Sequence, residues 1–114
     1  MSVLLCLCSC PDDASAARIA DALVDERLAA CVSIVPGMRS VYRWQGKVQR
    51  SDEMLLLVKT SAACADTLRQ RIVALHPHEV PEVVMIETDG GLPAYLDWVA
   101  AETTPANTAD SDAD

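Results

Sequence analysis

Residues 28–60, LAACVSIVPGMRSVYRWQGKVQRSDEMLLLVKT, contain the pattern that decides the fold of this chain. The pattern predicts two β-strands, at about residues 32–44 and 47–60, joined by a turn at Gln45-Gly46. The strand ends nearer the core are apolar, and the far end of the hairpin is polar. Two large aromatic side chains, Tyr42 and Trp44, nevertheless lie on this polar arm. One hairpin cannot bury them against itself, so the segment predicts assembly with another chain.

The segments on either side of the hairpin predict one helix and one strand each. A short apolar run at residues 3–10, closed by Pro11-Asp12, is typical of a buried strand. Apolar residues at helical spacing follow it, after potential capping residues at Asp12 and Ser15. A second helix is expected to begin at Ser61 and to end at His76, because Pro77 disfavours helical backbone before it. Residues 83–88 predict the fourth strand, and residues 93–101 predict a last short helix.

This order of elements predicts an α+β protein. Strand-helix-strand followed by strand-helix-strand gives the ferredoxin-like sandwich, in which two helices cover one face of an antiparallel sheet with a long central hairpin. A C-terminal helix is added to that plan. We expect a single domain over residues 1–102 and a flexible acidic tail over residues 103–114.

Composition narrows the choice of partners. The net charge is −8, of which the three aspartates of the tail supply three, leaving −5 for the domain. An acidic domain disfavours binding to nucleic acid or to an anionic membrane surface and favours cations. The N-terminal run lacks a basic flank and is too short to span a membrane. Five cysteines, an odd number, argue against a disulfide framework, so we expect reduced thiols in the cytoplasm.

Three of the cysteines alternate along the first strand and therefore point to one face. These are Cys6, Cys8 and Cys10. Thiolates from neighbouring strands can converge on a soft metal, and a thiol of this strand could meet Cys31, at the start of the second strand, at one end of the sheet. The alternative is that each is a small buried apolar residue, as free cysteines often are.

The two histidines lie in the loop HPHEVPE at residues 76–82. In an extended segment, His76 and His78 point the same way, and imidazole nitrogens suit copper and zinc. The alternative is a pair of solvent-exposed loop histidines. Catalytic patterns are sparse: a Cys31–His76 nucleophile pair would make a hydrolase, but nothing in the sequence places the two together. Arg39 and Arg43 either bind an anion or keep the hairpin soluble.

Short motifs in a fixed order carry a resemblance to a known family. They are Cys8 with Pro11-Asp12, Leu28-Ala29-Ala30-Cys31, Pro36-Gly37, Tyr42-x-Trp44-x-Gly46-Lys47, Lys59-Thr60, His76-Pro77, Pro81-Glu82 and Tyr95-Leu96-x-Trp98. With these motifs, residues 3–101 resemble the CutA family of divalent-cation tolerance proteins.

The resemblance implies a ferredoxin-like homotrimer, held by edge-to-edge sheet contacts and by hairpins whose Tyr42 and Trp44 lie in the trimer interface. It also implies copper binding through positions that match Cys8, Cys31 and His76. Positions near the family's intersubunit clefts match Trp44, Lys59, Glu82, Tyr95 and Trp98.

The chain departs from the family pattern around its histidines. Leu75 stands where some members have a second histidine, and His78 stands where a tyrosine is usual, so His78 is the candidate replacement ligand. Cys6 and Cys10 are thiols that the pattern does not require.

The resemblance favours a non-enzymatic trimer that binds copper, and secondarily zinc or other divalent cations, and supports metal tolerance. The alternative is a regulatory module similar to the PII signal proteins, with a small molecule or nucleotide bound in the clefts between subunits.

Overall fold

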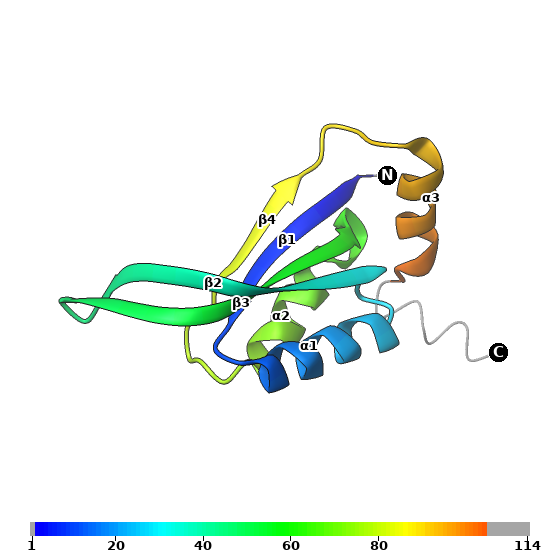
Figure 1. Ribbon diagram of the computed structural model, residues 1–114. Coiled ribbons are helices and arrows are strands. Elements are labelled where there is room, and N and C mark those ends of the chain that lie inside the picture. Colours follow the sequence, from blue (N-terminus) through cyan, green and yellow to red (C-terminus); the bar gives the residue numbers. More distant parts are fainter. Residues whose placement is uncertain (1, 105–114) are drawn as a thin grey trace.

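The protein is a two-layer α+β sandwich in the computed structural model, which describes residues 2–104 (Figure 1). Four strands form one antiparallel sheet in the order β2-β3-β1-β4, and the predicted ferredoxin-like fold is confirmed. The elements are β1 (Val3–Cys10), α1 (Asp13–Asp25), β2 (Cys31–Trp44), β3 (Lys47–Ser61), α2 (Ala65–Leu75), β4 (Val83–Glu87) and α3 (Pro93–Glu102).

Local chemistry explains where the helices begin and end. The carboxylate of Asp12 accepts a hydrogen bond from the backbone N–H of Ser15 at 2.8 Å, which caps α1 as expected. The second helix starts later than predicted, because residues Ala62–Cys64 form a 3₁₀ turn before α2. Ser61 does not cap it; its hydroxyl instead accepts a hydrogen bond from Thr103. Pro77 ends α2 at Leu75, and His76 already has extended backbone angles.

The core lies between the sheet and helices α1 and α2. Cys6, Cys8 and Cys10 all point into it and have no exposed surface, as their alternation predicted. They pack in one cluster with apolar residues of the two helices, including Ile19 and Ile72. Burial of these side chains is the main stabilising contribution to the fold.

Helices α1 and α2 leave the other side of the sheet uncovered, and we call it the open face (Figure 1). Cross-strand register and alternation place these side chains on it: Leu5, Leu7, Ser9, Cys31, Ser33, Leu55, Leu57, Lys59, Val84 and Ile86. Val84 and Ile86 are 48% and 43% exposed, which is high for apolar residues in the body of a sheet.

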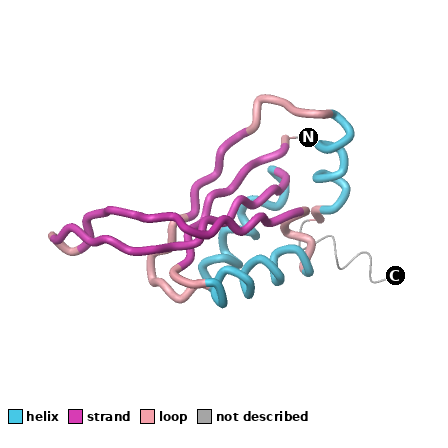
Figure 2. Tube along the Cα trace, in the orientation of Figure 1, coloured by secondary structure: helices cyan, strands magenta, loops and turns pink. Residues whose placement is uncertain are grey.

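The β2–β3 hairpin extends beyond the helical layer as an arm (Figure 2). A register shift between Val35 and Met38, with Gly37 at φ 81°, bends β2. The tip is a two-residue turn in which Gln45 and Gly46 both have positive φ, the geometry of a tight hairpin turn. Tyr42 and Trp44 remain 43% and 47% exposed on the arm, so the chain alone does not bury them.

The C-terminal end of the described region is tied to the body. Thr103 is buried, and the backbone N–H of Thr104 donates to the carbonyl of Arg27 at 2.9 Å. These two residues therefore belong to the folded domain, although the sequence placed them in the tail. The rest of the predicted flexible tail lies outside the described residues. None of the helices in the described region is long and apolar enough to cross a membrane.

Candidate functional site

Cys8, Cys10 and His76 form a buried group in which each residue offers one metal-ligating atom, and these atoms all lie within 4.8 Å of one another. The two thiols come from the end of β1, where alternation turns both toward the helices. His76 is the first residue after α2, and its backbone N–H still donates to the carbonyl of Ile72 at 2.8 Å. The end of α2 thus carries the imidazole to the end of β1.

Hydrogen bonds determine the tautomer of His76. Its Nε2 lies 2.7 Å from the carbonyl oxygen of Ser9, which can only accept, so Nε2 carries the proton and donates. Its Nδ1 accepts from the backbone N–H of His78 at 3.0 Å. The ring is therefore neutral and both nitrogens have partners. A metal ion can bind His76 only if it breaks one of these two hydrogen bonds.

The two thiols of the group differ in acidity. The pKa of Cys8 is raised, because its S–H donates to the sulfur of Cys10 and because burial disfavours the thiolate. The same hydrogen bond lowers the pKa of Cys10 below its ordinary value of 9.0. Cys10 is thus the first of the pair to become a thiolate, the form that binds metals. Burial and the nearby Glu82 raise the pKa of Cys6 to about 11.

Cys31 lies elsewhere, on the open face. It pairs in register with Lys59, which pairs with Leu5, so its side chain points away from the layer that holds Cys8. The ammonium of Lys59 lies 3.7 Å from the sulfur of Cys31 and 2.6 Å from the hydroxyl of Ser33. Within one chain, therefore, the structure does not bring Cys31 to Cys8 or His76. A Cys31–His76 catalytic pair is not formed either.

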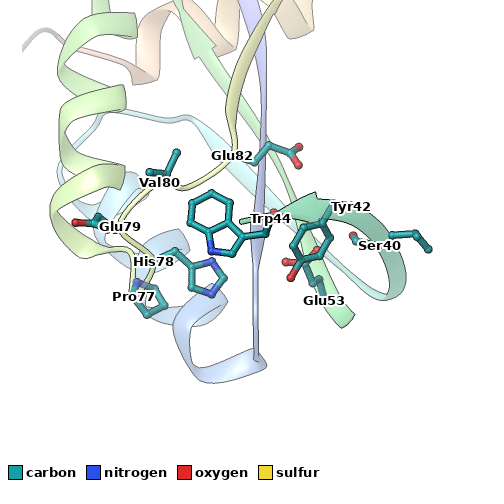
Figure 3. A pocket seen from close by; sticks show the side chains of 11 residues that line it. Ser40, Tyr42, Trp44, Glu53, Pro77, His78, Glu79, Val80 and Glu82 are labelled. Atoms are coloured by element: carbon teal, nitrogen blue, oxygen red, sulfur yellow. The ribbon is translucent and has the colours of Figure 1, made fainter. Parts of the chain in front are cut away.

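A cavity of about 690 Å³ separates the arm from the loop after α2 (Figure 3). The arm contributes Ser40, Val41, Tyr42, Trp44 and Glu53, the loop contributes Pro77, His78, Glu79, Val80 and Glu82, and β1 contributes Ser9. In Figure 3 the imidazole of His78 and the indole of Trp44 lie next to each other in this view of the cavity. Ser9 and His78 are also the partners of His76, so the buried group lies directly behind this wall.

The five residues that the family resemblance assigned to clefts between subunits lie in three separate places in this chain. Trp44 and Glu82 line the cavity, and Lys59 lies on the open face. Tyr95 and Trp98 pack on each other on α3, with ring centroids 5.6 Å apart. The ring of His78 lies 5.0 Å from that of His76, but His78 is outside the group of close ligand atoms.

Sequence reasoning left open whether Cys10 is a ligand, and the structure places it beside Cys8 and His76. Its alternation with Cys8 was the available signal, because residues two apart on a strand share a face. The sequence pattern did not predict that His76 lies at the C-terminal end of β1.

Residues 4–102 match a family described as "CutA1 divalent ion tolerance protein". The chain belongs to the CutA1 family. A divalent-cation tolerance protein CutA from Thermus thermophilus is 50% identical over 97 residues, which cover 85% of this chain and 94% of that protein. A role in divalent-cation tolerance follows from this membership.

Solved CutA structures have the same fold. The CutA crystal structure from Xylella fastidiosa superposes with a TM-score of 0.89 at 44% identity, covering 91% of this chain and all of that one (100%). A protein named "Protein CutA, chloroplastic" from Arabidopsis thaliana is 42% identical over 93 residues, covering 82% of this chain and 51% of that protein. The chain therefore spans about half the length of this plant relative.

Proposed function

We propose that this CutA1 protein binds copper, and secondarily zinc or other divalent cations, without catalysing a reaction. The proximity of Cys8 and His76 carries the proposal, because their ligand atoms lie within 4.8 Å in a buried setting. Thiolate and imidazole together suit copper and zinc, whereas magnesium and calcium require oxygen ligands. Bound copper would be held by these side chains and shielded from solvent, which is what tolerance to a reactive ion requires.

Cys31 is not a ligand of the buried site in this proposal. Since it lies on the open face with Lys59, it is a candidate ligand only for a second site on that face. His78 positions the ring of His76 through its backbone N–H in the metal-free protein only. The ligand set of the buried site is thus narrower than the four residues suggested by the sequence.

A homotrimer is the second part of the proposal. The open face exposes apolar side chains such as Val84 and Ile86, and the arm exposes Tyr42 and Trp44. Large exposed apolar side chains of this kind favour a protein interface. Copies that pair through the sheet and the arms would cover both regions. Such an assembly would also place the cavity, with Trp44 and Glu82, near the boundary between subunits.

We also propose a cytoplasmic location, because all five cysteines are free in the described structure and metal binding requires reduced thiols. Relatives vary in this respect, since one is named chloroplastic and a structure from Archaeoglobus fulgidus is titled periplasmic.

A competition titration tests metal binding. Reduced protein is titrated without oxygen against Cu(I), Cu(II) and Zn(II), each with a coloured chelator as competitor. We expect Cys8→Ala and His76→Gln each to weaken copper binding by at least about tenfold, as loss of a ligand or its support does. Cys64→Ala removes a buried thiol outside the group and serves as the control. Unchanged affinity in both ligand variants would refute the site.

The cavity keeps one alternative open, a regulatory module that binds a small molecule. Its volume suits such a ligand, and aromatic side chains line it. Among the described residues that line it, the charged ones are Glu53, Glu79 and Glu82, with no lysine or arginine, which disfavours a nucleotide phosphate. A thermal-shift screen separates the two functions: stabilisation by a nucleotide or small metabolite, and not by metal, would favour the alternative.

A further inference from the structure

We propose that Cys10 is a third metal ligand and that, with Cys8 and His76, it forms a closed, sulfur-rich site that prefers Cu(I) to divalent cations. The inference rests on the proposed metal-binding function and adds a ligand and a preferred oxidation state to it.

The distances suit a shared ion. Sulfur and nitrogen ligands lie about 2.3 and 2.0 Å from a metal of this size, so two ligands of one ion are separated by at most roughly 4.6 Å. The three ligand atoms already lie within 4.8 Å of one another. The three ligand atoms are therefore already close to the separation that one shared ion requires.

Cys6 shows that this placement is specific to Cys10. Both cysteines lie on the same strand and the same face, and both are fully buried. Cys6 pairs in register with Val58 and Met85, an apolar setting, and it is not in the group of ligand atoms. It therefore fits the ordinary role of a small apolar core residue. The two cysteines form a matched pair for mutagenesis.

The donor set determines the preferred ion. Two sulfurs and one imidazole nitrogen are soft donors, which favour Cu(I) and Zn(II) over harder cations. Structural zinc sites almost always use four protein ligands, whereas Cu(I) is satisfied by two or three. Among the described residues the group offers three, with no carboxylate. All three residues are buried, which disfavours completion of a tetrahedral shell by water.

Charge and protons balance in this site. Binding of Cu(I) releases one proton from each thiol to solvent and leaves two thiolates with one monovalent cation, a net charge of about −1. The guanidinium of Arg18 donates to the carbonyl of Leu75 at 3.3 Å, which places a positive charge beside the residue that precedes His76. This cation offsets part of the cost of holding a negative charge near the core, whereas the carboxylates of Asp12 and Glu53 act on Cys10 in the opposite direction.

The test compares Cys10→Ala with Cys6→Ala in the reduced full-length protein, with Cu(I) competed against a coloured chelator and with Zn(II) as a rival ion. We expect Cys10→Ala to lose at least about tenfold in Cu(I) affinity and most of its preference over Zn(II), and Cys6→Ala to match the wild type. X-ray absorption of the copper-loaded wild type should show two sulfurs and one nitrogen, and the Cys10 variant one sulfur fewer.

Equal Cu(I) affinity in the Cys10 and Cys6 variants would overturn the inference, as would displacement of Cu(I) by an equal concentration of Zn(II). If Cys8→Ala and His76→Gln weaken binding but Cys10→Ala does not, the proposed function stands and only this inference fails. If no variant weakens binding, the proposed function itself fails. Should Cys10→Ala not fold, Cys10→Ser keeps the size of the side chain, and its harder oxygen should lower Cu(I) affinity in the same way.

Discussion

The backbone N–H of His78 donates to Nδ1 of His76 across 3.0 Å, and this bond requires Nδ1 to carry no proton. A metal that binds through Nδ1 displaces the bond directly. A metal that binds through Nε2 forces the remaining proton of the neutral ring onto Nδ1, which then cannot accept. Metal binding therefore breaks the hydrogen bond of the His78 amide whichever nitrogen binds the metal. Since His78 also lines the cavity, metal binding at the buried group affects the cavity wall.

Hydrogen exchange provides the first test. We expect the amide of His78 to exchange faster, by at least about tenfold, when copper is bound than in the metal-free protein. The amide of Thr104, which donates to the carbonyl of Arg27 beyond the C-terminal end of α1, is the internal control and should not change. Unchanged or slower exchange at His78 with metal bound would show that His76 is not a ligand.

The second prediction concerns the open face. Val84→Glu should shift the proposed trimer toward monomer, because an unpaired carboxylate in a buried interface costs about 3 kcal/mol or more per chain. Val73→Glu is the matched control, since Val73 on α2 is 49% exposed, compared with 48% for Val84, but lies in the helical layer. Sedimentation velocity at several concentrations measures both. Equal effects of the two substitutions would argue against assembly through the sheet.

The third prediction separates the two thiol sites. Cys31→Ala should leave copper affinity at the buried site within about twofold of wild type, because Cys31 lies on the opposite side of the sheet from Cys8. The same competition titration used for Cys8→Ala measures this. A loss comparable to that of Cys8→Ala would mean that the two cysteines share an ion in a manner that a single chain does not allow.

The fourth prediction concerns the cap of α1. The hydrogen bond from Ser15 holds the pKa of Asp12 below its ordinary value of 3.8. A depressed pKa means that the cap stabilises the fold at neutral pH and that this stabilisation is lost as the pH falls through 3.8 and below. The difference in urea midpoint between wild type and Asp12→Ala should therefore shrink below that pH. Asp13→Ala, which removes an exposed charge of the first turn, is the control.

Much of the fold was predictable because it depends on local pattern. The bounds of β1 follow from one apolar run closed by Pro11, and the end of α2 follows from Pro77. The late start of α2 was not predicted: residues Ala62–Cys64 form a 3₁₀ turn, and the hydroxyl of Ser61 bonds Thr103, 42 residues away in sequence, in place of capping the helix.

The candidate site was only partly predictable, because tertiary contacts decide it. Alternation predicted that Cys8 and Cys10 share a face, but the arrival of His76 depends on how α2 packs. The sequence left open that Cys31 meets a thiol of the first strand or is an ordinary packed cysteine. The sheet order places β3 between their strands, and the register turns Cys31 to the open face. A shift of one residue in register would have placed Cys31 on the other face of the sheet. The sequence pattern alone does not determine the register to one residue.

An anomalous difference map, recorded at the copper absorption edge from crystals of the reduced protein loaded with Cu(I), tests the central claim most directly. We expect one strong peak per chain between the sulfur of Cys8 and the ring of His76, within about 2.5 Å of both. Copper that is absent from Cys8 and His76, and that lies only at Cys31, only at the exposed carboxylates or at no ordered position, would contradict the account.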